Sequence, residues 1–473
     1  MSQLRPRPTE PLVVIMGSTG TGKSELAVEL ATRFNGEIIN ADAMQMYRGS
    51  PIITNKIPLG EQRSIPHHLL GTVGLEEDPW AVGLFKREAS RIIREIRSRG
   101  RLPIVVGGTH YYLDGLLFDN HLVDDTDSID AENGFLPTDE RSAVFPILEA
   151  PTEVIWKKLK EVDPVMAERW HPNNRRKIQR SLEIFLSTGR RASDIYAEQE
   201  KKKASKWSSE DGPQRSASFQ SLLFWVYTQR EVLNARLDKR VDKMVENGLL
   251  EETRELFQYA KARAQAGEPV NLTQGIWQSI GFKQFGPYVK GIDEGADPVF
   301  LEQLKQSSIE NTKTATRQYA KHQIRWITKK TLPLLRDEHA LRHLYLLDST
   351  DVSQWSENVG ERAAGLTRQF LDGQELPEPS EVSETAKEVL AATITASSAP
   401  KGTPCQKTCD LCKVTAVTEE RWALHLSSHR HRKSVRHAKR TALVVLESPS
   451  QEPIVGDREQ SISSGPSTAP EPS

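Results

Sequence analysis

Short apolar runs alternate with amphipathic stretches along much of the chain. Bounded by turn residues, the runs predict buried strands at residues 12–16, 36–40, 102–106 and 222–227. Between the first three runs, residues 23–34 and 80–99 carry apolar side chains at helical spacing. Strands that alternate with helices are typical of an α/β fold with a parallel sheet, and we predict that fold class here.

Elsewhere the pattern is helical or polar. Helical periodicity recurs at residues 152–162, after Pro172 and at 316–326, where basic residues recur every three or four positions. Polar, turn-rich sequence predicts an irregular connection at 120–149 and a surface loop at 201–218. Residues from about 373 to 404 lose aromatic side chains and gain Pro, Glu, Ser and Thr, which predicts a linker. Residues 447–473 have the same character and predict a disordered tail.

A glycine-rich turn joins the first strand to the first helix. It has the form G-x-x-x-x-G-K-[ST] of a phosphate-binding loop, in the expected context of strand, turn and helix N-terminus. Backbone N–H groups and the helix dipole attract phosphate oxygens there, Lys23 would reach the terminal phosphates, and Ser24 would hold magnesium. The loop indicates a phosphorylated ligand without saying which one. Its residues are Gly17, Ser18, Thr19, Gly20, Thr21, Gly22, Lys23 and Ser24.

Asp42 follows the second predicted strand. Parallel strands end at the same edge of a sheet, so we expect Asp42 to lie close to the phosphate loop, where open α/β sheets bind ligands. A carboxylate there can coordinate magnesium through water or act as a general base. An acid that only caps the next turn is the structural alternative.

The third strand is followed by glycines rather than by an acid. A hydrolysing nucleotidase usually has an aspartate at this point to hold magnesium and water, whereas this chain continues Val106-Gly107-Gly108-Thr109. The two glycines indicate a close approach of the backbone to a ligand, and Thr109 offers a hydroxyl. The predicted site therefore has a phosphate cradle but little equipment for ATP hydrolysis.

Two helical segments, one after Pro172 and one at residues 316–326, combine basic and aromatic side chains. Arg176 and Arg180 share one face of the helix after Pro172, and Trp170 lies just before its start. Such faces suit phosphate contacts and base stacking, although a solvated charged face is the ordinary alternative. The net charge of the whole chain is only −1, so any nucleic-acid surface must come from local clusters of this kind.

The 473-residue chain has the composition of a soluble protein with polar tails. No apolar run approaches the roughly 20 residues that span a bilayer, so we predict no membrane partner. The first eleven residues show no amphipathic helix period, so a transit peptide is unsupported.

All three cysteines lie within one short segment near the C-terminus. The spacing of Cys409, Cys412, His425 and His431 falls within the Cys2His2 zinc range, and His429 is an alternative fourth ligand. Thr418 is expected to cap a helix that carries His425, with His431 near its end. We predict structural Zn²⁺, and we leave Cys405 out of the site. The basic run that follows indicates nucleic-acid contact or nuclear import.

Taken together, these motifs resemble the tRNA dimethylallyltransferase (tRNA isopentenyltransferase) family. The resemblance runs from about residue 12 to residue 326, and the appended zinc finger is similar to the eukaryotic, especially fungal, form. The matching segments are Gly17 to Ser24, Asn40 to Gln45, Thr54 to Lys56, His67 to Leu70, Val106 to Thr109, Arg176 to Glu183, Gly281 to Lys283, and Arg317 to Lys321.

The resemblance implies that the phosphate loop holds the pyrophosphate of dimethylallyl diphosphate. The five-carbon group would pass to N6 of the adenosine 3′ of the anticodon, with Asp42, Thr109 and Lys23 catalytic. Arg240 would join the loop and Mg²⁺ in binding the diphosphate. The tRNA would contact Asp42, Ala43, Met44, Gln45, Thr109, Arg176, Lys177, Ile178, Gln179 and Arg180. The family often has serine where this chain has Ala43.

Domain boundaries follow from these patterns. We predict a P-loop NTPase-like core, a helical insertion that binds tRNA, and a C-terminal Cys2His2 finger. The segments are a disordered N-terminus (1–11), core (12–118 and 219–335), insertion (119–218), C-terminal extension and linker (336–404), finger with basic extension (405–440) and disordered tail (441–473). The predicted protein is a monomer of the cytoplasm, with the mitochondrion and nucleus as further candidate compartments.

Three other functions share parts of this pattern. A P-loop kinase or NTPase is the default for the opening motif but lacks the acid after the third strand. An adenylate isopentenyltransferase shares the core, although the insertion and the finger favour tRNA. A non-enzymatic RNA-binding adaptor would have no need of Asp42 beside an intact phosphate loop.

Overall fold

The computed structural model describes residues 7–118, 145–207, 220–397, 403–412 and 414–446. These residues form two compact units. One comprises Met1–Ala150 with Glu183–Pro400, and the other comprises Pro151–Leu182 with Lys401–Ser473. Residues 447–473 of the predicted tail and most of the predicted connection at 120–149 lie outside the described residues. Residues 441–446, which the predicted domain boundaries also assign to the disordered tail, are instead helical.

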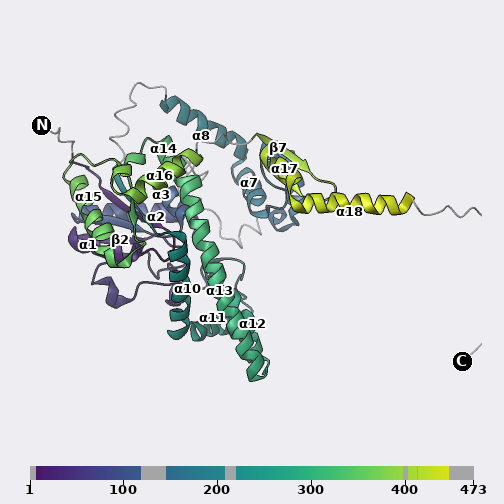
Figure 1. Ribbon diagram of the computed structural model, residues 1–473, viewed down its shortest axis with the longest axis horizontal. Helices are drawn as coiled ribbons and strands as arrows, with labels where there is room; N and C mark the ends of the chain where they lie inside the picture. Colours follow the sequence, from purple (N-terminus) through teal and green to yellow (C-terminus); the bar gives the residue numbers. More distant parts are fainter. Residues whose placement is uncertain (1–6, 119–144, 208–219, 398–402, 413, 447–473) are drawn as a thin grey trace, which may run out of the picture. The chain divides into compact units, whose positions relative to one another are not determined.

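A six-stranded sheet forms the centre of the first unit, and every strand pairs in parallel with its neighbours (Figure 1). The strand order is β3-β2-β4-β1-β5-β6. The strands are β1 (Leu12–Gly17), β2 (Gly36–Asn40), β3 (His67–His68), β4 (Leu102–Val106), β5 (Ser221–Tyr227) and β6 (Leu344–Asp348).

Helices cover both faces of the sheet, which explains why its central strands are apolar throughout. In β1, Val13 and Ile15 pack with the helices of one face, and Val14 and Met16 pack with those of the other. The first face carries α1 (Lys23–Arg33) and α15 (Arg362–Leu371). The second carries α2 (Val82–Ser98), α3 (His110–Leu117), α14 (Leu332–Asp337) and α16 (Glu384–Ser397).

Further helices extend the first unit. The longest is α13, and α12 and α10 pack against it. Their bounds are α8 (Ala192–Trp207), α10 (Arg230–Glu246), α11 (Leu249–Gln265), α12 (Phe282–Asp293) and α13 (Pro298–Trp326). No helix among the described residues is both long and apolar enough to cross a membrane.

The structure corrects the predicted linker and the predicted loop. Within residues 373–404, α16 packs onto the core with Ala386 fully buried and Leu390 nearly so. Residues 201–207 belong to α8, as their lysine and alanine content permits. The sheet also gains β6, which lies beyond the predicted end of the core at residue 335. Alanine-rich and short apolar segments carry a weak signal, and only their packing partners decide their structure.

The second unit is small and joins two distant parts of the sequence. Its strands β7 and β8 form an antiparallel hairpin, and α6 contacts β7. Helix α7 (Arg175–Thr188) begins in this unit and ends in the first. The remaining elements are α5 (Thr152–Val162), α6 (Pro164–Arg169), β7 (Pro404–Thr408), β8 (Thr415–Thr418), α17 (Glu419–Ser427) and α18 (His429–Leu446).

Candidate functional site

The phosphate loop leaves β1 and enters α1 with its helix-side N–H groups open. Among the described residues, no protein group accepts a hydrogen bond from the backbone N–H of Gly22, Lys23 or Ser24. Gly22 lies in the left-handed region at φ 89°, a conformation that glycine adopts without strain. The loop therefore presents donors for an anion at the positive end of the α1 dipole.

Lys23 folds back over this loop. Its Nζ donates to the Ser18 carbonyl oxygen at 2.6 Å. Burial lowers the pKa of Lys23 to about 8, and nearby Asp42 opposes that shift. Because a buried ammonium lacks full hydration, an incoming phosphate would find a cation that needs a counter-charge.

Asp42 lies close enough to Lys23 for their charges to interact. Burial raises the pKa of Asp42, while the positive charges of Lys23 and Arg240 oppose the rise. Its Oδ1 accepts from the Met44 N–H at 3.1 Å, so the predicted turn-capping role and the position beside the loop coexist. The side chain of Asn40 fixes the Asp42 backbone through both its N–H and its carbonyl. A carboxylate held in this way and with a raised pKa can act as a general base.

The loop after β4 packs directly against the Asp42 segment. The Thr109 N–H donates to the Ala41 carbonyl oxygen at 3.2 Å, and the Ala43 N–H donates to Thr109 Oγ1 at 2.9 Å. A Cβ at Gly107 would collide with the Ala41 backbone, so glycine permits this approach. The two segments that the sequence places in the site are therefore tied together.

Two more cations lie near Asp42. Arg240 Nη1 donates to Thr19 Oγ1 at 2.8 Å, and burial lowers the pKa of Arg240 to about 10. Burial lowers the pKa of Lys56 to about 8, and Glu252 and Asp42 oppose that shift. The site thus concentrates positive charge around one carboxylate, as expected for binding a polyanion.

The other residues predicted to contact an acceptor have mixed positions. Gln45 Nε2 donates to the Asn55 carbonyl oxygen at 3.0 Å, so one of its donors is already used. On α7, Arg176 and Lys177 are exposed, and Lys177 Nζ lies 4.4 Å from the Trp170 ring centroid. Ile178 is fully buried, so its side chain packs in the interior and is unavailable for RNA contact.

Two cysteines and two histidines of the second unit converge on one point. Their ligand atoms all lie within 4.8 Å of one another: Cys409, Cys412, His425 and His431. The cluster includes His431 rather than His429, and such a donor set is compatible with structural zinc. Thr418 caps α17, as predicted, by accepting from the Arg421 N–H. However, α17 ends at Ser427, so His431 lies in the first turn of a second helix.

A family comparison matches the description "IPP transferase" to residues 45–330, more than half of the chain. The chain belongs to the IPP transferase family. It is 38% identical to the tRNA dimethylallyltransferase of Schizosaccharomyces pombe, over 92% of this chain and 96% of that protein. It is 33% identical to the tRNA dimethylallyltransferase of Homo sapiens, over 94% and 91% of the two chains.

A solved structure also resembles this IPP transferase. It is a crystal structure of a eukaryotic dimethylallyltransferase acting on tRNA. The two chains share 35% sequence identity, with a TM-score of 0.74. The match covers 93% of this chain and 99% of that chain. The expected family and the expected core fold are therefore both confirmed.

Sequence reasoning did not single out two further residues that lie near Lys23 or the phosphate loop of this IPP transferase. His110, the first residue of α3, is only 4% exposed, and neither ring nitrogen has a hydrogen-bond partner among the described residues. Burial and the charge of Lys23 lower its pKa to about 3. Arg236 reaches from α10 to the Gly20 carbonyl oxygen and to the end of β6. The position of His110 directly after Thr109 was the available signal, whereas Arg236 depends on long-range packing.

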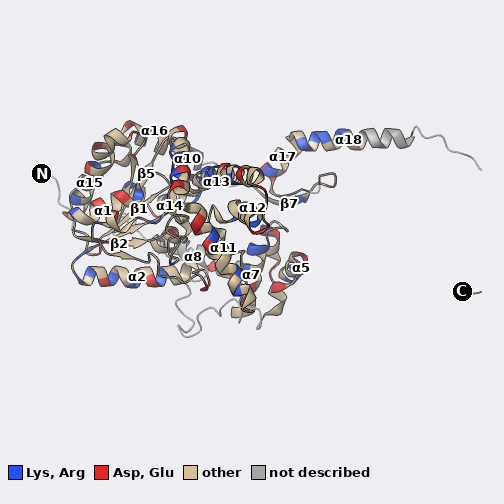
Figure 2. Ribbon diagram, turned by 90° about the horizontal axis from the view of Figure 1, so that it is seen from below, with Lys and Arg blue, Asp and Glu red and all other residues tan. Residues whose placement is uncertain are grey.

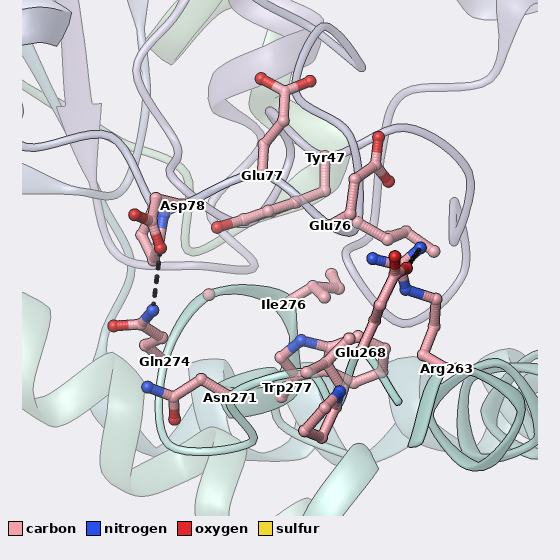
Figure 3. Close-up of a pocket in the computed structure, with 15 residues that line it drawn as sticks. Tyr47, Glu76, Glu77, Asp78, Arg263, Glu268, Asn271, Gln274, Ile276 and Trp277 are labelled. Atoms are coloured by element: carbon pink, nitrogen blue, oxygen red, sulfur yellow. Dashed lines mark hydrogen bonds and ion pairs between the residues drawn. The ribbon is translucent and has the colours of Figure 1, made fainter. Parts of the chain in front are cut away.

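A separate pocket of about 450 Å³ lies away from the phosphate loop of the IPP transferase (Figure 3). Glu76, Glu77, Asp78 and Glu268 give it an acidic rim, and Gln274 Nε2 donates to Asp78 Oδ1 at 3.1 Å. The Tyr47 hydroxyl is enclosed beside Gly275 and has no partner among the described residues. The pocket contains none of the sequence-predicted site residues.

Proposed function

We propose that this protein is a tRNA dimethylallyltransferase. It would move the dimethylallyl group of dimethylallyl diphosphate to N6 of the adenosine 3′ of the anticodon. The observation that carries the proposal is the electrostatic interaction of Lys23 with Asp42, next to the open N–H groups of Gly22, Lys23 and Ser24. The names of the fungal and human relatives support the same activity.

In the proposed reaction, the adenosine N6 attacks C1 of the dimethylallyl group. A C–N bond forms, the C–O bond to the diphosphate breaks, and Asp42 takes the proton that N6 loses. Lys23, Arg240 and the loop amides stabilise the negative charge of the departing pyrophosphate. A base at Asp42 fits this role because burial raises its pKa, which improves proton acceptance near neutral pH.

Magnesium is the proposed cofactor, bound beside the diphosphate of dimethylallyl diphosphate. Ser24 is exposed at the start of α1, and no described protein group hydrogen-bonds its hydroxyl, so it fits a magnesium ligand beside the diphosphate. Bound magnesium would add positive charge against the leaving pyrophosphate. The structural zinc would be held by Cys409, Cys412, His425 and His431.

The proposed acceptor is a tRNA whose target base leaves the stack to reach Asp42. Base flipping is the general solution for chemistry on an enclosed base, and in this proposal Thr109 and Gln45 would contact the flipped base. The exposed basic residues of α7 and the blue residues at the start of α18 in Figure 2 would bind phosphates. We propose a monomer, with cytoplasmic, mitochondrial and nuclear forms to be tested by localisation of a tagged protein.

The test supplies the purified protein with radiolabelled dimethylallyl diphosphate, Mg²⁺ and either tRNA or AMP. We expect label in tRNA and none in AMP. Label in AMP alone would support the adenylate transferase instead. ATP turnover, measured in parallel without a prenyl donor, should be absent, and a robust rate would favour the NTPase.

A further inference from the structure

Gln323 bridges the two halves of the site. It lies on α13, 4% exposed, far in sequence from the loops that it contacts. Its Oε1 accepts from the Thr19 N–H at 2.7 Å, and its Nε2 donates to the Gly108 carbonyl oxygen at 2.9 Å. A Cβ at Gly108 would collide with Nε2, so this contact requires glycine.

Both bonds use donors or acceptors that would otherwise face a ligand. Thr19 is the third residue of the phosphate loop, and a side chain accepts from its N–H, whereas the N–H groups of Gly22, Lys23 and Ser24 on the helix side have no acceptor among the described residues. With its N–H held by Gln323, Thr19 offers no backbone donor to a phosphate, and its hydroxyl oxygen accepts from Arg240 Nη1. In P-loop NTPases, the same kind of loop cradles the outer phosphates of a triphosphate.

We infer that Gln323 is a specificity-determining residue that closes the strand side of the phosphate loop, so that the site accepts a diphosphate and rejects a triphosphate. The helix-side amides and Lys23 suffice for two phosphates. A third phosphate would meet the Gln323 amide at the place where the Thr19 N–H could otherwise donate to it. This inference rests on the proposed function, because it explains how a nucleotide-type loop takes a prenyl diphosphate.

The same bridge positions the acceptor side. A Cβ atom built on Gly108 would lie 3.2 Å from Asp42 Oδ2. The backbone that Gln323 holds is therefore next to the carboxylate. Loss of Gln323 would therefore loosen the spacing between the diphosphate and Asp42. We expect a lower kcat in addition to altered phosphate selectivity.

The test compares two probes, inorganic pyrophosphate and inorganic tripolyphosphate, as inhibitors competing with the prenyl donor in the full-length enzyme. The wild type should bind pyrophosphate more tightly. In Gln323→Ala, we expect the ratio of the two inhibition constants to shift by about tenfold toward tripolyphosphate, the size of one lost hydrogen bond to a buried group. Gln318→Ala, an exposed glutamine on the same helix, is the matched control and should keep the wild-type ratio.

Two results would overturn the inference. One is an unchanged inhibition ratio in a folded Gln323→Ala enzyme, with its melting temperature as the check on folding. The other is a wild type that binds tripolyphosphate as tightly as pyrophosphate. If Gln323→Ala does not fold, Gln323→Met provides the second variant: its side chain fills similar space but neither accepts from Thr19 nor donates to Gly108, so the same shift toward tripolyphosphate is expected. Failure of the proposed function looks different, because the wild type would then transfer no prenyl group to tRNA.

Discussion

The Ala43 N–H donates a hydrogen bond to Thr109 Oγ1 at 2.9 Å. This bond joins the segment after β2 to the segment after β4, and it leaves the hydroxyl proton of Thr109 free to donate. The backbone of Ala43 therefore provides the link, and no side-chain hydroxyl is needed at position 43. One threonine can thus hold the Asp42 segment in place and present a donor to an acceptor base.

Replacing Thr109 tests that dual role. Thr109→Val keeps the shape but removes the acceptor for Ala43 and the free donor, so we expect kcat to fall at least tenfold, on the scale of one or two hydrogen bonds. Thr109→Ser keeps the hydroxyl and should retain most activity. Single-turnover transfer to tRNA is the measurement. Equal activity of the valine and serine variants would contradict the role.

Asp42→Asn separates the chemistry from the fold. Asparagine can still accept from the Met44 N–H but cannot take a proton, so we expect prenyl transfer to fall by about 10²-fold or more, the usual contribution of a general base. Affinity for tRNA, measured by filter binding, should stay near the wild-type value. Lost tRNA binding would instead show that Asp42 is structural.

The pH dependence of donor binding should follow Lys23. Its pKa of about 8 means that the free enzyme loses this positive charge as pH rises from 7 to 9. Donor binding must then take up a proton, so KM for dimethylallyl diphosphate should increase with pH in that interval. KM for tRNA at saturating donor serves as the comparison. A donor KM that stays flat to pH 9 would exclude this titration.

The zinc cluster should support tRNA binding rather than chemistry. Cys412→Ser removes a ligand and should abolish stoichiometric zinc, measured by metal analysis, and weaken tRNA binding severalfold. The donor KM should not change, because the cluster belongs to the second unit. Cys405→Ser, outside the cluster, is the matched control. Full zinc content in Cys412→Ser would rule out this ligand set.

The buried carboxyl of Asp114 makes the free energy of unfolding depend on pH in the direction opposite to that of most acids. Asp114 accepts from Trp326 Nε1 and Thr331 Oγ1, both at 2.7 Å, and burial raises its pKa from 3.8 to about 6. The native state then binds the proton more tightly than the unfolded state. This contribution to the free energy of unfolding is present below pH 3.8 and is lost as pH rises to about 6.

Asp114→Asn removes the titration. Urea unfolding of wild type and variant at several pH values should show that the variant gains stability relative to the wild type between pH 4 and 6. The difference in unfolding free energy between the two proteins isolates the contribution of Asp114 from those of other carboxyls. Glu37 is one of these: burial favours a higher pKa, but hydrogen bonds and charges of Arg99 and His68 lower it to about 2. A constant difference across that interval would contradict the assignment.

Local sequence predicted most of the site. The phosphate loop, Asp42 and Thr109 each follow a short apolar strand, and strand ends in parallel sheets converge on one edge. Gln323 and Arg236 could not be predicted in this way. Each lies on a helix whose own pattern shows only amphipathic periodicity, and its contact partner is set by how that helix packs on the core. Strand β6 was missed for the same reason.

Strand β1 lies between β4 and β5, and β5 lies about 200 residues later in the chain. While the protein is being synthesised, the edge of β1 that pairs with β5 stays unpaired until β5 leaves the ribosome, and the apolar residues of β1 remain uncovered on that side. At the roughly 5–20 residues per second of translation, that interval is about ten seconds or more. The nascent core therefore has an open strand edge, which makes this protein an expected client of chaperones that shield unpaired strands.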